Sequence, residues 1–187
     1  MSILSRKTGE IVQEISDARN RLLEAVFGLS AEQTDFQPQP GAWSIGEVLH
    51  HLALTDEATA KLMSVMLNRA ESEGLPEDPS PDDSVLGSIK ALVEGADEEK
   101  APAPDRVTPR SYVPAAEALS RLETSRGRML QSVEALSALD GSRLTYRHPF
   151  FGELDYYQWL LITGWHERRH TGQIGRIKTT PGFPHGA

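Results

Sequence analysis

The sequence contains no cysteine among its 187 residues. This absence excludes disulfide bonds, thiolate zinc sites and cysteine nucleophiles, and it fits a reducing compartment. The chain also lacks any apolar run approaching the roughly 20 residues that a membrane-spanning helix needs. Residues 1–8 lack the apolar core of a signal peptide. We therefore expect a cytoplasmic protein with no membrane partner.

Positive charge is scarce as well. The chain has 19 lysines and arginines against 27 aspartates and glutamates, which gives a formal net charge of −8. Because nucleic acids and anionic membranes bind basic surfaces, a nucleic-acid partner is not expected. The hydrophobic fraction of 39% and the charged fraction of 25% are ordinary for a globular protein. At this length we predict a single domain spanning residues 1–187, with a substantial core.

Four stretches place apolar residues at helical spacing. They are residues 4–29, 44–69, 114–139 and a last stretch that begins at Glu153 or Asp155 and ends near Lys178. Strand patterns are almost absent, so the sequence predicts an all-α four-helix bundle. In the first stretch, the apolar stripe leaves the charged side chains for the outside. These are Glu14, Asp17, Arg19 and Arg21.

Residues 71–110 interrupt this pattern with proline, aspartate and glutamate. We interpret them as a long connection over the surface of the bundle. Within it, residues 82–93 combine an acidic start with apolar residues at helical spacing, which predicts a short amphipathic helix. A connection of this length usually has a role or is partly mobile, and the sequence leaves both alternatives open.

Three histidines are candidates for a metal site. His166 and His170 are four residues apart and share the buried face of the last helix. Buried imidazoles need a partner, which is either a divalent metal or neighbouring hydrogen-bonding groups. On the second helix, His51 falls on the inward stripe, whereas His50 falls on a more polar side and is interpreted as a boundary residue. Three histidines with one open position are typical of catalytic zinc, which favours a site at His51, His166 and His170.

Residues 166–170 read His-Glu-Arg-Arg-His, which also matches the zinc-peptidase pattern in which the glutamate is the general base. The longer form of that pattern fails, because Gln173 stands where a glycine is required and Arg176 where a third histidine is required. A peptidase is therefore disfavoured.

Two glutamates near these histidines have more than one interpretation. Glu167 is either a proton-transfer group of the site or a surface carboxylate paired with Arg168 or Arg169. Glu47 either orients the imidazole of His51 or completes a capping box at the start of its helix. The spacing leaves both pairs of alternatives open.

Residues 43–52 (Trp-Ser-Ile-Gly-Glu-Val-Leu-His-His-Leu) resemble the start of the second helix in DinB-like (YfiT-like) proteins. Residues 148–154, followed by 165–174, resemble the turn and final helix of that family. The resemblance covers nearly the whole chain. It implies a four-helix bundle, often a homodimer, with a site for zinc or nickel. Position by position, the implied ligands are His51, His166 and His170.

The same resemblance implies an enzyme acting on a small molecule. The family includes thiol S-transferases and isomerases that use bacillithiol, mycothiol or glutathione, and proteins named as metal-dependent hydrolases. On this basis we prefer thiol S-transfer to small electrophiles, with a low-molecular-weight thiol as co-substrate. Hydrolysis by metal-activated water is the alternative, since a divalent ion acidifies either a water or a thiol. A non-catalytic bundle with a structural metal is the remaining hypothesis.

Overall fold

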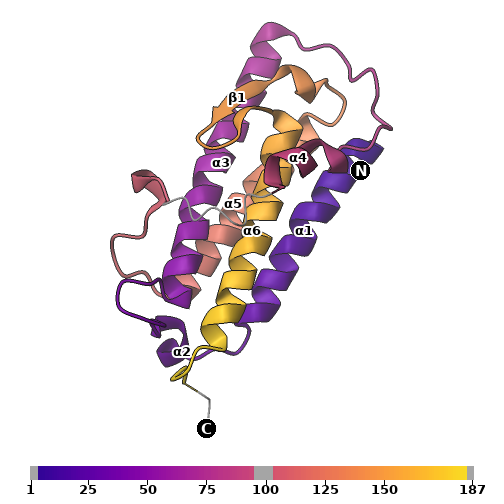
Figure 1. The fold of residues 1–187 in the computed structure, drawn as a ribbon. Coiled ribbons are helices and arrows are strands. Elements are labelled where there is room, and N and C mark those ends of the chain that lie inside the picture. The colour runs from indigo at the N-terminus through magenta and orange to yellow at the C-terminus, as the bar shows by residue number, and fades with distance from the viewer. Residues whose placement is uncertain (1–3, 95–102, 185–187) are drawn as a thin grey trace.

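The computed structural model describes residues 4–94 and 103–184. Four long helices lie side by side as a bundle (Figure 1). They are α1 (Arg6–Val26), α3 (Ile45–Glu73), α5 (Ala115–Ala135) and α6 (Tyr156–Lys178). α3 packs chiefly on α5, α1 packs chiefly on α6, and contacts between α3 and α6 join these two pairs. Within the described ranges, no helix is both long and apolar enough to cross a bilayer. The predicted four-helix bundle is confirmed.

Short elements fill the connections between the long helices. They are α2 (Ala31–Asp35), the 3-10 helix η1 (Leu86–Ile89), α4 (Lys90–Val93), and the 3-10 helices η2 (Asp105–Val107) and η3 (Gly141–Arg143). The helix expected within residues 82–93 is confirmed as η1 followed directly by α4. η2 lies in the same long connection and was not predicted, because three residues are too few to show a period.

Capping boxes set the start of both helices that carry the candidate histidines. Before α3, the backbone N–H of Ser44 donates to Glu47 Oε2 at 2.8 Å, and Glu47 N–H donates to Ser44 Oγ at 3.2 Å. Before α6, Asp155 and Gln158 exchange the same pair of bonds at 3.0 and 2.8 Å. These bonds satisfy N–H groups that a helix start leaves without partners. Glu47 is therefore a capping residue.

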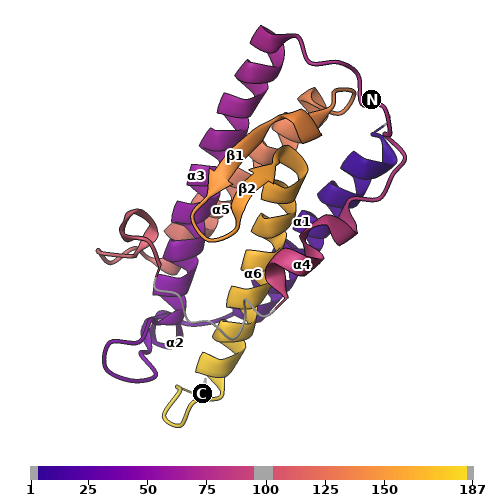
Figure 2. The same cartoon turned by 45° about the horizontal axis from the view of Figure 1, so that its top comes forward.

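A β-hairpin, absent from the sequence-based prediction, precedes α6. β1 (Thr145–His148) pairs antiparallel with β2 (Gly152–Asp155). Figure 2 shows the hairpin over the end of the bundle at which α6 begins. Trp159 of α6 donates its indole N–H to the carbonyl of Tyr146 at 3.1 Å. The hairpin is an addition to the predicted all-α bundle, because four-residue strands held by tertiary contacts show too little alternation to be recognised from the sequence.

The core consists of two hydrophobic clusters that share the four long helices. The first contains Ile11 of α1, Met63 of α3, Met129 of α5 and Leu160 of α6. The second contains Leu22 of α1, Leu49 of α3, Leu122 of α5 and Ile174 of α6. On every helix, one buried charged residue falls in the sequence between the two clusters. These four are Arg19, Asp56, Arg126 and Glu167.

The four charged side chains form one buried ion quartet. Arg19 Nε lies 2.5 Å from Glu167 Oε1, and Arg19 Nη2 lies 2.9 Å from Asp56 Oδ2. Arg126 Nη2 lies 2.9 Å from Glu167 Oε2 and 3.5 Å from Asp56 Oδ2. Two positive charges balance two negative ones, as burial requires. The expectation that Arg19 faces outward is wrong. Of the two interpretations of Glu167, the one that makes it a surface carboxylate is also wrong.

We predict that Glu167→Gln lowers the free energy of unfolding by about 3–5 kcal/mol, because it leaves buried guanidinium charge without its carboxylate. Urea denaturation followed by circular dichroism measures this loss. The matched control is Glu73→Gln, which removes the exposed Arg69–Glu73 pair near the end of α3 and should cost less than about 1 kcal/mol. Equal losses in the two variants would show that the quartet does not stabilise the bundle.

Candidate metal centre

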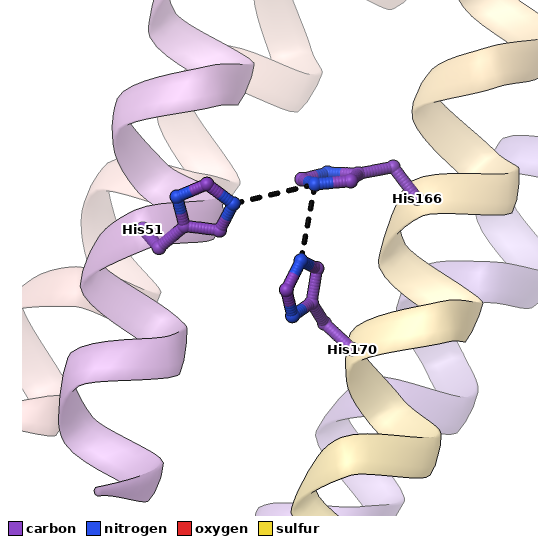
Figure 3. Close-up of side chains that lie close together, drawn as sticks. All are labelled: His51, His166 and His170. Carbon is purple, nitrogen blue, oxygen red and sulfur yellow. Dashed lines mark hydrogen bonds between the residues drawn. The ribbon is translucent and has the colours of Figure 1, made fainter. Parts of the chain in front are cut away.

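The structure brings the three predicted ligands together between α3 and α6. Figure 3 shows His51 reaching from α3 toward His166 and His170 of α6. His166 Nε2 lies 3.3 Å from His51 Nε2 and 3.1 Å from His170 Nε2. All three donor atoms lie within 4.8 Å of one another. Nitrogens bound tetrahedrally to zinc at about 2.0–2.1 Å lie about 3.3 Å apart, so the measured spacing fits a divalent ion.

Hydrogen bonds fix the orientation of two of these rings. His51 Nδ1 lies 2.8 Å from the carbonyl oxygen of Val107, and His170 Nδ1 lies 2.7 Å from Gln173 Oε1. Since both partners are acceptors, each Nδ1 carries the proton and each Nε2 presents its lone pair to the centre. Metal-binding histidines are held in this way by a partner behind the ring. Val107, and not Glu47, therefore orients His51.

Burial keeps the three imidazoles neutral. It lowers the pKa of His170 to about 3, with a further decrease from His51. Burial likewise moves the pKa of His166 well below its usual range, and the neighbouring His170 and His51 act in the same direction. The pKa of His51 is also lowered by burial. Neutral imidazole is the form that binds metals, so the site is ready for a cation at neutral pH.

A cavity of about 1600 Å³ lies in front of the histidines. Its wall includes the apolar side chains of Trp43, Leu62, Phe151, Trp159 and Trp165. The ring centroid of Trp43 lies 4.9 Å from that of His51. Structural zinc sites are closed by four protein ligands, whereas catalytic sites keep a position open to substrate. Three histidines at the wall of a cavity correspond to the second arrangement.

Glu167 does not share this cavity, although it follows His166 directly in the sequence. Its side chain is 1% exposed and both of its carboxylate oxygens accept hydrogen bonds from the quartet arginines. It is not among the residues that line the cavity. The structure thus assigns Glu167 to the ion quartet.

His50 is buried, which contradicts its interpretation as a boundary residue. It hydrogen-bonds to the backbone of Ser111, and burial lowers its pKa. Ser111 directly follows the long connection 71–110, the same connection that supplies Val107 to His51. This connection returns to cover α3. It therefore buries the face of α3 that carries His50, although the sequence of that face is partly polar.

His148, which the sequence places in a turn, is a fourth histidine at the cavity. Its Nδ1 accepts the backbone N–H groups of Phe150 and Phe151 at 3.2 and 3.3 Å. Its ring lies 4.8 Å from that of Trp159, centroid to centroid. Burial lowers the pKa of His148 to about 4, and Arg106 adds to the effect. The ring is therefore neutral with its proton on Nε2, and it lines the cavity together with His166.

Comparison with known proteins identifies the family. Residues 14–174 match the model of the DinB superfamily. The chain belongs to this superfamily. It is 28% identical over 164 residues to the uncharacterized protein YuaE of Bacillus subtilis (strain 168), covering 87% of this chain and 94% of YuaE. It is 27% identical over 167 residues to a protein of Bacillus cereus (strain 03BB102) named "Putative metal-dependent hydrolase", covering 89% and 83% of the two chains.

Two solved structures share the fold. The four-helix bundle protein TT2238 superposes with a TM-score of 0.59 at 20% identity, covering 91% of this chain and 99% of its own. YfiT from Bacillus subtilis, described as a probable metal-dependent hydrolase with an unusual four-helix bundle topology, gives a TM-score of 0.59 at 19% identity. That match covers 98% of this chain and 92% of YfiT. The resemblance to YfiT-like proteins is confirmed, and so is the bundle topology.

We predict that metal binding to the folded, metal-free superfamily member releases fewer histidine protons at about pH 6 than three ordinary histidines would, since burial has already lowered all three ligand pKa values. Because folding lowers these pKa values, protons compete with the metal for an imidazole only when the pH falls to the lowered pKa of that histidine. For His170 this pKa is about 3. Three histidines with the ordinary pKa would release about two protons. Calorimetry in two buffers of different ionisation enthalpy counts the protons, and a release of about two would contradict the prediction.

Proposed function

We propose that this DinB-superfamily protein is a metal-dependent hydrolase acting on a small molecule. One divalent ion would be held by His51, His166 and His170. The observation that carries the proposal is the convergence of the three Nε2 atoms at the wall of a cavity. The names of the Bacillus cereus relative and of YfiT support hydrolysis over other metal chemistry.

When bound, the ion supplies Lewis acidity, which polarises a carbonyl group and lowers the pKa of water to about 7. Three neutral imidazoles leave its full charge available for this purpose. Zinc and nickel are the metals we propose, since imidazole suits both. The chain itself holds the ligands in place through Val107 and Gln173, and its aromatic wall limits the access of bulk water.

His148 would contribute a hydrogen bond to the substrate. The two backbone N–H groups at Nδ1 fix the tautomer, so the ring can only donate from Nε2. Within the described residues, no protein atom accepts this N–H. Because the pKa is about 4, the ring stays neutral at working pH and donates without losing its proton. A donor of this kind stabilises the negative charge that develops on a carbonyl oxygen during hydrolysis.

Thiol S-transfer stays a prediction, as does its low-molecular-weight thiol. The site could acidify a thiol as readily as water, but the Bacillus cereus relative and YfiT both carry the name of a metal-dependent hydrolase. The homodimer also stays a prediction. The non-catalytic alternative, with a purely structural metal, is disfavoured by the cavity in front of the histidines.

We expect the protein, purified without a histidine tag, to contain about one divalent ion per chain and to hydrolyse members of a panel of small esters and amides, such as 4-nitrophenyl acetate. His170→Ala should lose both the ion and the activity, because it removes one of only three ligands. Elemental analysis and absorbance at the wavelength of nitrophenolate measure the two effects.

A conjugation assay with glutathione and 1-chloro-2,4-dinitrobenzene runs beside this panel. Turnover only in the thiol assay would favour S-transfer over hydrolysis. A chelator that lowers the melting temperature, in a protein without turnover in either assay, would indicate the structural-metal alternative. An unchanged metal content in His170→Ala would contradict the site itself.

A pair of variants tests His148. In His148→Asn the side-chain oxygen can still accept the two turn N–H groups, but no donor reaches the position of Nε2. We expect about a 100-fold loss of kcat/KM with unchanged metal content and melting temperature. His148→Gln places an amide near Nε2 and should retain more activity at lower stability. Equal activity of Asn, Gln and wild type would exclude the proposed hydrogen bond.

A further inference from the structure

Among the described residues that line the cavity, the balance of charge is opposite to that of the whole chain. The chain carries a net charge of −8, yet basic residues outnumber acidic ones among the described lining residues. The basic residues are Lys61, Arg106, Arg147, Arg169 and Arg176, and the acidic ones are Asp56 and Glu94. Such a reversal, confined to one cavity of an acidic protein, indicates selection for an anion.

The acidic lining residues do little to neutralise this charge. The carboxylate of Asp56 already accepts hydrogen bonds from Arg19 and Arg126 of the ion quartet. Glu94 lies at the end of α4, where its side chain is exposed. Among the described lining residues, basic side chains are therefore in excess on the side of the histidines.

Three of the arginines line the cavity together with the histidines: Arg106, Arg169 and Arg176. The charge of Arg169 lowers the pKa of His51, His166 and His170. Arg176, seven residues further along α6 and on the same face, contributes to the lowered pKa of His170. Arg106 of η2 has this effect on His148. Since Arg169 and Arg176 belong to α6 and Arg106 to η2, arginines line the cavity both from the α6 side and from the loop side.

A guanidinium fork matches the oxygen geometry of carboxylate and phosphate groups better than that of other ligands. A positively charged cavity with apolar walls also focuses its field on a small anion. A divalent ion at the three histidines would add charge of the same sign. A neutral substrate would gain nothing from these groups, whereas a substrate with one anionic group would be both attracted and oriented.

We propose that the substrate carries a carboxylate or phosphate group that Arg169 and Arg176 bind, which directs the bond to be cleaved toward His51, His166 and His170. This inference rests on the proposed hydrolase function, whose substrate class it narrows. Arg106 lies across the cavity, beside His148, and would contribute at longer range.

Titration calorimetry of the protein as purified tests the binding step, with succinate and inorganic phosphate as probes and succinamide as the neutral control. We expect at least one anion to bind and succinamide not to bind. Arg169→Gln and Arg176→Gln should each lower the affinity for the anion about tenfold or more, since each variant loses a charge-assisted hydrogen bond. Added NaCl should lower this affinity further, because salt screens the charges. The stronger of the two probes identifies the anionic group.

Arg128→Gln is the matched control, because Arg128 is exposed on α5 and does not line the cavity. It removes the same charge and should leave the affinity unchanged. Melting curves establish that the variants are folded, and Arg176, which is exposed near the end of α6, serves as the second test if Arg169→Gln is unfolded. Affinity that is equal in wild type and in the cavity variants would overturn the inference.

A pair of esters separates this inference from the proposed function. We expect mono-4-nitrophenyl succinate to be hydrolysed with at least tenfold higher kcat/KM than the neutral 4-nitrophenyl valerate, and Arg176→Gln to reduce that ratio. Equal rates for both esters, unchanged in the variant, would overturn the anion site while hydrolysis stands. Anion binding that depends on the arginines, without hydrolysis of either ester, would instead contradict the hydrolase function.

Discussion

The pairing of two guanidinium groups with two carboxylates in the middle of the bundle constrains the rest of the molecule. Each of the four long helices contributes one member, so a rotation or shift of any helix would leave a buried charge unpaired. Such a charge costs several kcal/mol. Asp56 lies five residues after His51, and Glu167 directly follows His166. The interaction that sets α3 against α6 therefore also sets the spacing of the metal ligands.

Neutrality is the second property of the quartet that matters to the site. Because its charges cancel, it can lie beside the histidine cluster without adding a net charge next to it. The two hydrophobic clusters on either side exclude water from it and supply the burial that stabilises the bundle. The field at the metal centre is then set by the arginines of the cavity, which are not part of the quartet. The arginines that stabilise the bundle are thus different from those proposed to recognise the substrate.

Helical periodicity was sufficient to predict the bundle and to place His51 and the pair on α6 on inward faces, because a stripe reports which side of a helix is buried. The stripe does not show which buried side chains contact one another. The partners Arg19 and Glu167 are 148 residues apart, and the acceptor for His51 is a backbone carbonyl at Val107, which no side-chain pattern marks. Gln173, by contrast, follows His170 by three residues and could have been predicted from helical geometry.

The parts of the site that the sequence did not predict lie outside the long helices. Val107 and Arg106 belong to the connection between α3 and α5, and His148 belongs to the hairpin before α6. A segment held by a few contacts to a rigid bundle can change without moving the two helices that carry the ligands, because the quartet holds α3 and α6 independently of it. The helices thus determine where a metal ion binds, and the two loops determine much of what reaches it. In this fold, metal site and substrate specificity are separable, so the likeness of two bundles supports the first more strongly than the second.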